Sequence, residues 1–493
     1  MNLEKTSYRQ IFKTTSIFGG VQVFNILIGI IRSKVIAILL GPAGIGIIGL
    51  LTSTLDMIKG ITGFGLGSSA VKNVAAANSH KDTQRISIIV TTLRRMVWLT
   101  GLLGVLITLA LSPLLSKFTF GNQEYTYTFI LLSVTLLFSQ ISVGQNVILQ
   151  GTRKLNYLAK SNLLSALLGL IFTVTLYYFF GIKGIVPVLI TTSVITLSLS
   201  FYFSQKVVIE KIQLSFKEVW KEGKSMIIMG FMLSLSGFIS LVVSYLTRIY
   251  IGRAGGIEEV GLYNAGFAIT GTYVGLVFTA MSTDFYPRLS SVAHDNQLAK
   301  ETINHQSEIA ILILAPILLL FFVFIHWIVQ LLYSYQFIKI NEMIRWAALG
   351  MFFKATAWAI GFLFLAKGIA KIFLLSEFVT NIYILILNII CYKYLGLNGL
   401  GIAFLISYII YLLQVFIICH KMYLFNFNKN FIDVFIKQLI CAIACFCVVK
   451  FVGSPYQYII GSMLIFFSAG YSLKELDKRL NLKEIITKNK KTL

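Results

Sequence analysis

The chain has 493 residues, of which 57% are hydrophobic and only 12% are charged, against roughly 25% charged residues in soluble domains. Its mean hydropathy of +0.82 excludes the soluble classes, because a water-soluble protein of this size could not bury so much apolar surface. The composition predicts an all-α polytopic membrane protein. In a membrane protein, a net charge of +23 is explained by basic residues that collect on one side of the membrane. No nucleic-acid partner is therefore expected.

A spanning helix needs about 20 mostly apolar residues, and windows of this size predict about fourteen transmembrane helices. The expected spans are residues 16–40, 44–68, 90–115, 125–149, 161–181, 184–204, 225–251, 261–283, 308–332, 343–366, 372–393, 398–419, 431–451 and 456–473. The third span and the last pair are the weakest, because Arg94 and Arg95 lie in the former and the latter are short.

The basic residues orient these spans. With the N-terminus inside, most Lys and Arg fall in inside segments, which is the bias expected of cytoplasmic loops. The outside segments hold only Lys117, Lys183, Arg253, Lys339, Lys393 and Lys450. The pattern predicts a multi-pass membrane protein with both termini in the cytoplasm.

A glycine-rich turn occurs twice, at 41–50 and, six spans later, at 252–262. An even number of spans gives both halves the same orientation, which predicts two pseudo-symmetric, parallel six-helix lobes. The lysine-rich segment between them also contains apolar residues and is expected to lie on the inner surface as an amphipathic helix. The predicted parts are an N-lobe (1–204), a cytoplasmic amphipathic linker (205–224), a C-lobe (225–419), an additional pair of spans (420–473) and a basic cytoplasmic tail (474–493).

Small residues line one face of the second expected span. They recur at helical spacing, so that they either let another helix approach or form a cavity wall. The positions are Gly49, Ser53, Asp56, Gly60, Gly63 and Gly67. Asp56 within the stripe favours the cavity wall.

Ionisable residues at membrane depth usually face a cavity or a partner. The basic candidates are Arg32, Lys34, Lys59, Arg248, Arg345 and Lys354. The acidic candidates are Asp56, Glu377 and Asp284, the last of which lies near an inner end. Because cations outnumber anions, a cavity lined by these groups is expected to bind an anionic solute such as a phosphate or diphosphate.

On the tenth span, Trp346, Gly350, Lys354 and Trp358 are spaced by four residues and share one helix face. A lysine between aromatic rings suits a sugar–phosphate, since the rings can stack on the sugar while the ammonium binds an oxyanion. Alternatively, the tryptophans are interface or core residues. Arg345 lies on the opposite face near the outer end and could extend to the interface.

The acidic candidates Asp56 and Glu377 also have more than one possible role. Asp56 and Lys59 are three residues apart and can pair with each other. Glu377 on the eleventh span is a candidate for proton coupling, for pairing with a cavity cation, or for a hydrogen bond between helices.

The chain carries no catalytic signature. It has no P-loop, its five histidines form no cluster with carboxylates, and its five cysteines lie in apolar stretches. We therefore predict no catalytic residues, no cofactor and no metal site.

Three stretches resemble those of bacterial O-antigen and enterobacterial-common-antigen flippases, in the multidrug/oligosaccharidyl-lipid/polysaccharide exporter superfamily. Arg32 and Lys34 followed by Gly-Pro-Ala-Gly-Ile-Gly at 41–46 are similar to the first outer turn of these proteins. Tyr-Pro-Arg-Leu-Ser at 286–290 is similar to the inner end of their eighth helix. The third stretch, similar to their tenth and eleventh helices, contains Arg345, Trp346, Gly350, Lys354, Trp358, Gly361, Ala366, Lys367, Phe373 and Glu377.

The resemblance implies two six-helix lobes around a central cavity and alternating access, with the thirteenth and fourteenth helices forming a lipid-facing groove in some relatives. The implied substrate is an undecaprenyl-diphosphate-linked oligosaccharide, and transport rather than catalysis is implied. Membrane lipids, a polysaccharide polymerase and a chain-length regulator are the implied partners.

Three alternatives remain open at this stage. A cation-coupled multidrug antiporter of the same fold would need an acidic, aromatic cavity. A membrane polysaccharide polymerase or glycosyltransferase usually needs a large outside loop, and the longest outside loops here have about a dozen residues. A scaffold of a polysaccharide assembly complex would not need cations at membrane depth.

Overall fold

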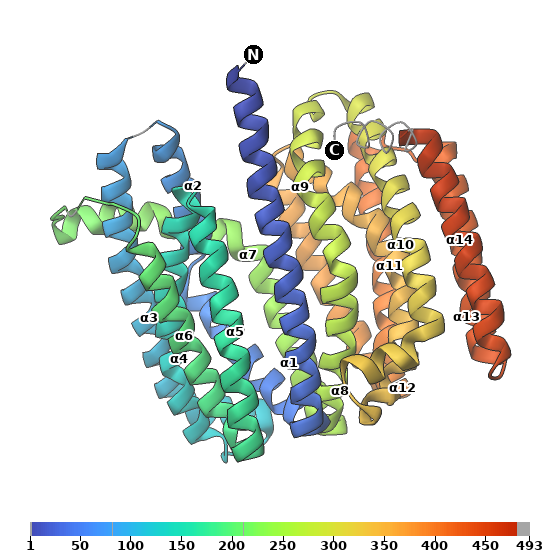
Figure 1. The fold of residues 1–493 in the computed structure, drawn as a ribbon, viewed down its shortest axis with the longest axis horizontal. Coiled ribbons are helices and arrows are strands. Elements are labelled where there is room, and N and C mark those ends of the chain that lie inside the picture. The colour runs from blue at the N-terminus through green and yellow to red at the C-terminus, as the bar shows by residue number, and fades with distance from the viewer. Residues whose placement is uncertain (1, 81, 211, 481–493) are drawn as a thin grey trace. The chain divides into compact units, whose positions relative to one another are not determined.

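The computed structural model describes residues 2–80, 82–210 and 212–480. It divides into two compact units, unit 1 (Met1–Gly261) and unit 2 (Leu262–Leu493), and α-helices make up most of both (Figure 1). Because a helix satisfies its own backbone hydrogen bonds, it is the form that such apolar segments can take in lipid. The expected lobe boundary at 205–224 stays a prediction.

Unit 1 contains seven helices and the start of an eighth within the described residues. Their bounds are α1 (Asn2–Thr62), α2 (Leu66–Ser79), α3 (Thr83–Phe120), α4 (Thr126–Gly151), α5 (Leu155–Phe180), α6 (Ile185–Ser204), α7 (Phe216–Gly255) and α8 (Ile257–Ala268).

Unit 2 contains the rest of α8 and the remaining helices. They are the π-helical turn η2 (Ile269–Val274), α9 (Gly275–Val292), α10 (Asn296–Leu332), the short 3₁₀ helix η3 (Tyr335–Ile340), α11 (Asn341–Ala366), α12 (Ala370–Tyr423), α13 (Lys429–Phe451) and α14 (Tyr456–Leu480).

Ten helical stretches of the described chain are long and apolar enough to cross a membrane. Three of them contain two segments each: α1 is kinked at Gly41, α12 is kinked at Gly396, and the four-residue turn Gly181–Gly184 separates α5 from α6. The eighth expected span corresponds to α8, η2 and α9, whose π-helical turn interrupts the α-helix. The prediction of an all-α protein with about fourteen spans is confirmed, and the chain is a multi-pass membrane protein.

The two glycine-rich turns pack against each other in unit 1. A Cβ on Gly46 would overlap the carbonyl oxygen of Ile257, and a Cβ on Gly261 would overlap that of Pro42. Gly41 has a φ of 63°, which is unfavourable for a residue with a side chain. The turns therefore need glycine both for backbone conformation and for close approach.

The second expected span ends earlier than residue 68. α1 ends at Thr62, and Phe64 (φ 46°) and Gly65 (φ 60°) are left-handed before α2 begins at Leu66. A Cβ on Gly65 would overlap the carbonyl oxygen of Gly230 on α7. The break therefore allows α2 and α7 to approach backbone to backbone.

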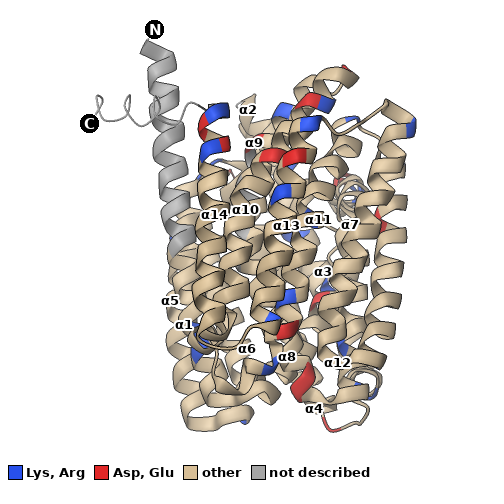
Figure 2. Cartoon of the chain, turned by 90° about the vertical axis from the view of Figure 1, so that its right-hand side faces the viewer, with Lys and Arg blue, Asp and Glu red and all other residues tan. Residues whose placement is uncertain are grey.

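The segment expected to form an amphipathic helix over 206–224 becomes helical only at Phe216. Ser215 and Glu218 form a reciprocal capping box there, which satisfies backbone N–H groups at the start of the helix. The first turns of α7 run across the neighbouring helices of unit 1 (Figures 1 and 2). Arg95 of α3 donates a hydrogen bond to the carbonyl oxygen of Leu214 (2.9 Å), which holds the preceding connection against α3.

Helix α10 forms the centre of unit 2, where it packs against α11, α13 and α14. Ile311, Leu314, Leu318 and Phe322 on this helix are fully buried. Charged residues gather at one end of α10, α13 and α14, and the middle of these helices is apolar (Figure 2). This pattern is typical of membrane-spanning helices, whose ionisable groups lie near the interfaces.

Candidate functional site

A cavity of about 670 Å³ in unit 1 lies beside the small-residue stripe of the second span. Asp56, Lys59 and Gly60 line it from α1 and Gly63 from the turn that follows, together with residues of α2, α4 and α7. A Cβ on Gly60 would come within 2.9 Å of the Phe238 ring. The stripe thus has both of the roles considered for it, because it forms a cavity wall and lets α7 approach.

Three of the predicted ionisable residues come together around this cavity. Lys59 on α1 and Arg248 on α7 both lie close enough to the Asp56 carboxylate to interact with it electrostatically. Arg248 also donates hydrogen bonds to the carbonyl oxygen (3.0 Å) and the hydroxyl of Ser244, one turn earlier in α7. The cluster contains two cations and one anion, so it keeps a net positive charge.

Arg32 and Lys34 are half-buried on α1 and are not among the residues that line this cavity. Arg32 lies within electrostatic range of Tyr177 on α5. Lys34 also has an interaction partner. The role of both residues in substrate binding stays a prediction.

In unit 2, Lys354 of α11 is surrounded by aromatic rings from two other helices. Its Nζ lies 5.9 Å from the ring centroid of Phe278, 5.5 Å from that of Phe404 and 5.1 Å from that of Tyr408. These distances are typical of cation–π interactions. In the described part of the chain, the Lys354 ammonium forms no ion pair with a carboxylate.

Glycine on α11 makes this arrangement possible. A Cβ on Gly350 would come within 2.6 Å of the Phe404 ring, and a Cβ on Gly361 within 3.0 Å of the Tyr411 hydroxyl. The missing side chains let α12 pack closely enough for Phe404 to reach Lys354. The face of α11 that contains Gly350 and Lys354 is therefore partly a helix-packing surface.

A chain of polar contacts continues from these rings to Glu377. The Tyr408 and Tyr411 rings are 6.2 Å apart, and the Tyr411 hydroxyl donates to Oε1 of Glu377 (3.1 Å). This hydrogen bond joins two residues of α12, since Glu377 precedes the kink at Gly396 and Tyr411 follows it. A hydrogen bond between helical segments is one of the roles considered for Glu377, and its roles in proton coupling or pairing with a cavity cation stay predictions.

The two tryptophans of the stripe lie in aromatic packing. Trp346 packs on Phe446 of α13 (centroids 4.7 Å apart), and the Lys450 Nζ lies 5.3 Å from the Trp346 ring centroid. Trp358 contacts the rings of Phe278, Phe285 and Phe362, with centroids 5.6, 5.6 and 4.9 Å apart. Sugar stacking on either tryptophan stays a prediction.

Two other candidates form ion pairs within their own helices. Arg345 pairs with Glu342 (2.5 Å), and Asp284 pairs with Arg288 (3.7 Å) with 82% of its side chain exposed. Each of these charges is therefore paired by a neighbour one turn away on its own helix. Within the described residues, no group of three or more His, Cys, Asp or Glu side chains could hold a metal ion.

Sequence reasoning found Lys354 but missed the residues around it. Phe404, Tyr408 and Tyr411 are spaced by four and three residues on α12, so they share one helix face. That spacing is a signal present in the sequence, although it does not identify the helix against which the face packs.

Comparison with protein families completes this description. The family described as "Polysaccharide biosynthesis protein" matches residues 11–293, which is more than half of the chain. This chain belongs to the polysaccharide biosynthesis protein family. A second family, "Lipid II flippase MurJ", matches residues 184–468. The resemblance to polysaccharide flippases of the exporter superfamily is therefore confirmed.

Curated relatives of this family member are distant but cover most of it. The "Lipid III flippase" of Escherichia coli (strain K12) is 22% identical over 396 residues, covering 78% of this chain and 92% of the relative. The "Putative O-antigen transporter" of Shigella flexneri is 23% identical over 381 residues, covering 75% and 88%.

Solved structures support the fold. An inward-facing multidrug resistance MATE transporter has a TM-score of 0.69 at 16% identity, with 81% of this chain and 94% of that chain covered. The lipid II flippase MurJ in an inward closed conformation has a TM-score of 0.66 at 15% identity, with 95% and 99% covered.

Proposed function

We propose that the protein is a flippase that moves an undecaprenyl-diphosphate-linked oligosaccharide, of the O-antigen repeat-unit type, from the inner to the outer leaflet of the bacterial cytoplasmic membrane. It acts as a transporter and not as an enzyme. Family membership supports a lipid-linked substrate. The structural observation that carries the proposal is the position of the Lys354 ammonium among three aromatic rings.

The chemistry of the substrate explains why such a site is needed. Sugar hydroxyls lose their hydrogen bonds to water if they enter hydrocarbon, and each unpaired group costs several kcal/mol. A polar path through the protein removes this cost, while the polyprenyl chain stays in the lipid. Cations along the path offset the cost of moving the diphosphate away from water.

Lys354 is suited to bind the diphosphate. The π faces of Phe278, Phe404 and Tyr408 hold its ammonium by their quadrupoles, which leaves the positive charge unneutralised. In unit 1, the Asp56, Lys59 and Arg248 cluster supplies a second positive site beside its own cavity. We propose that the two sites bind the headgroup during alternating access, with both chain termini in the cytoplasm.

Complementation tests this proposal. The gene is deleted in its native host and replaced by wild type, Lys354→Ala or the matched control Lys371→Ala, which removes an exposed lysine from the first turn of α12. We expect deletion to abolish surface polysaccharide and to accumulate lipid-linked repeat units on the inner leaflet. Lys354→Ala should reproduce this phenotype, and Lys371→Ala should behave as wild type.

Two results would overturn the proposal. Single lipid-linked repeat units on the outer leaflet of the deletion strain would indicate a polymerase, since transport would be intact. Normal surface polysaccharide in the deletion strain, with increased sensitivity to cationic drugs, would indicate a multidrug antiporter. Protein levels in the membrane fraction show whether each variant is made in equal amounts.

A further inference from the structure

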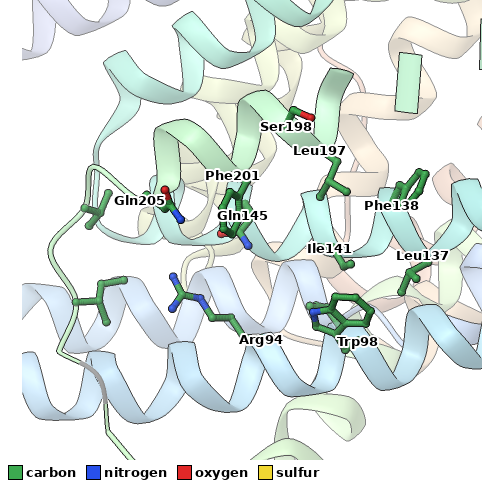
Figure 3. A pocket seen from close by; sticks show the side chains of 13 residues that line it. Arg94, Trp98, Leu137, Phe138, Ile141, Gln145, Leu197, Ser198, Phe201 and Gln205 are labelled. Atoms are coloured by element: carbon green, nitrogen blue, oxygen red, sulfur yellow. The ribbon is translucent and has the colours of Figure 1, made fainter. Parts of the chain in front are cut away.

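A second cavity in unit 1 lies outside both candidate sites. It has a volume of about 600 Å³, within the range of roughly 300–1,000 Å³ typical of small-molecule pockets. Arg94 and Trp98 project into it from α3, toward α4 and α6 (Figure 3). None of the residues that line it also lines the cavity beside Asp56.

The chemistry of this cavity is amphipathic. Arg94 is its charged lining residue, and no carboxylate lines the cavity. Gln145, Ser198, Gln205 and the indole N–H of Trp98 supply polar groups, and the other lining side chains are apolar. The carboxamide oxygen of Gln145 accepts a hydrogen bond from Ser204 (2.6 Å), which leaves its NH₂ group as the donor for a ligand.

Arg94 differs from its neighbours in having no hydrogen-bond or ion-pair partner among the residues that the structure describes. Arg95 donates to the carbonyl oxygen of Leu214, and Arg85 forms a two-pronged ion pair with Glu222, both N–O distances being 2.9 Å. Within the described residues, the Arg94 guanidinium forms no hydrogen bond or ion pair. Because Arg94 is exposed at the mouth of an apolar cavity, its guanidinium is accessible to an anionic group of a bound ligand.

The surface around the cavity is suited to lipid. Trp98 is 51% exposed and Phe201 is 47% exposed, and along α3 the side chains of Leu102 and Leu106 are also exposed. A tryptophan one turn from an arginine is the pairing found where a helix meets the membrane interface. These exposed side chains around the cavity are therefore of the kind that suits a membrane interface.

We propose that this cavity binds an anionic diacyl phospholipid, with its phosphate on Arg94 and the NH₂ group of Gln145, and with an acyl chain along Trp98 and Phe201. Charge complementarity selects an anionic headgroup, and the apolar lining selects a lipid over a soluble phosphate. The site does not depend on the identity of the transported oligosaccharide, since it lies on α3, α4 and α6 away from Asp56 and Lys59.

The test measures lipid binding by the purified full-length chain, without any transport reaction. Delipidated protein in detergent is titrated with phosphatidylglycerol or with phosphatidylcholine of the same acyl chains, and bound lipid is counted by native mass spectrometry. We expect at least one phosphatidylglycerol to bind more tightly than phosphatidylcholine. In Arg94→Gln its apparent Kd should rise roughly tenfold, equivalent to about 1.4 kcal/mol.

Two further variants separate this site from general surface charge and from misfolding. Arg153→Gln removes an exposed arginine outside the cavity and should leave the Kd unchanged. Ser198→Trp fills the cavity from an exposed lining position and should weaken binding while Arg94 is intact. Size-exclusion profiles identical to wild type show that the variants are folded.

Several outcomes would overturn the proposal. They are equal binding of the two phospholipids, equal weakening by Arg94→Gln and Arg153→Gln, or saturation of the site by glycerol phosphate, which has no acyl chain. Displacement of bound phosphatidylglycerol by a polyprenyl phosphate at an equal or lower concentration than the phospholipid would show that the site belongs to the transported lipid. Because no flipping is measured, failure of the proposed function leaves these readouts unaffected.

Discussion

A buried ion pair attaches α14 to α10 and provides a sharp test of how unit 2 is held together. Oε2 of Glu308 lies 2.8 Å from Nε of Arg479, with 3% of the Glu308 side chain and 23% of the Arg479 side chain exposed. The second carboxylate oxygen of Glu308 has no hydrogen-bond partner in the described part of the chain. Arg479→Met would therefore leave a buried carboxylate without its cation.

Removing one partner of a buried pair costs about 3–5 kcal/mol, because the remaining charge is uncompensated. We expect about 3 kcal/mol here, the lower end, because the Arg479 side chain is partly exposed and water can enter its place. At 2–4 °C per kcal/mol, the value for a unit of this size, the unfolding midpoint should fall by roughly 6–12 °C. Glu308→Gln combined with Arg479→Met should recover most of the loss, since residue 308 is then uncharged and Glu475, the other partner of Arg479, keeps its pair with Lys478.

The assay is thermal unfolding of the purified chain in one detergent, followed by a thiol-reactive dye. Cys441 and Cys445 on α13 are buried and Cys447 is exposed, so a Cys447→Ser background lowers the signal of the folded state. Lys478→Met is the matched control, because Lys478 is 60% exposed and its partner Glu475 keeps a second ion pair, with Arg479. Loss of such an exposed lysine should cost at most about 1 kcal/mol. Equal losses in Arg479→Met and Lys478→Met, or no recovery in the double variant, would refute the reasoning.

Two other predictions concern the packing of unit 1 and the driving force of transport. Gly46→Ala places a Cβ against the carbonyl oxygen of Ile257 and should lower the free energy of unfolding by about 1–3 kcal/mol. Gly237→Ala is the control, because its Cβ would meet no atom within 4 Å. Equal yields of monodisperse protein from the two variants would contradict this prediction. A substrate carrying two negative charges gains about 4–5 kcal/mol on moving outward across a 100 mV inside-negative potential. Flipping in proteoliposomes should therefore slow when an ionophore collapses the potential, and an unchanged rate would contradict this driving force.

The membrane architecture could be predicted because the signal is local. A spanning helix needs only its own run of apolar residues, and each of the fourteen expected spans coincides with a helical segment of the described chain. The expected boundaries were less accurate where tertiary contacts decide them. The second span was expected to reach residue 68, but the left-handed Gly65 and its contact with Gly230 end α1 at Thr62.

The candidate sites were predictable only in part, for the same physical reason. Helical spacing identified Asp56 with Lys59, because both belong to one helix. It could not identify Arg248 or Phe278 as neighbours of these sites, because they come from other helices that are distant in sequence. The Arg94 cavity was likewise missed, since α3, α4 and α6 meet there only in the folded protein.

The environments of the two lysines suggest different roles for them. Lys59 lies within electrostatic range of the Asp56 carboxylate, so a carboxylate already attracts its ammonium before a substrate arrives. Lys354 is held by ring faces at 5.1–5.9 Å, and a ring quadrupole attracts a cation without carrying a net opposing charge. Under the proposed function, a diphosphate would have to compete with the Asp56 carboxylate at Lys59, whereas no carboxylate of the described residues forms an ion pair with Lys354. Lys354 is for this reason the residue at which loss of charge should weaken substrate binding most.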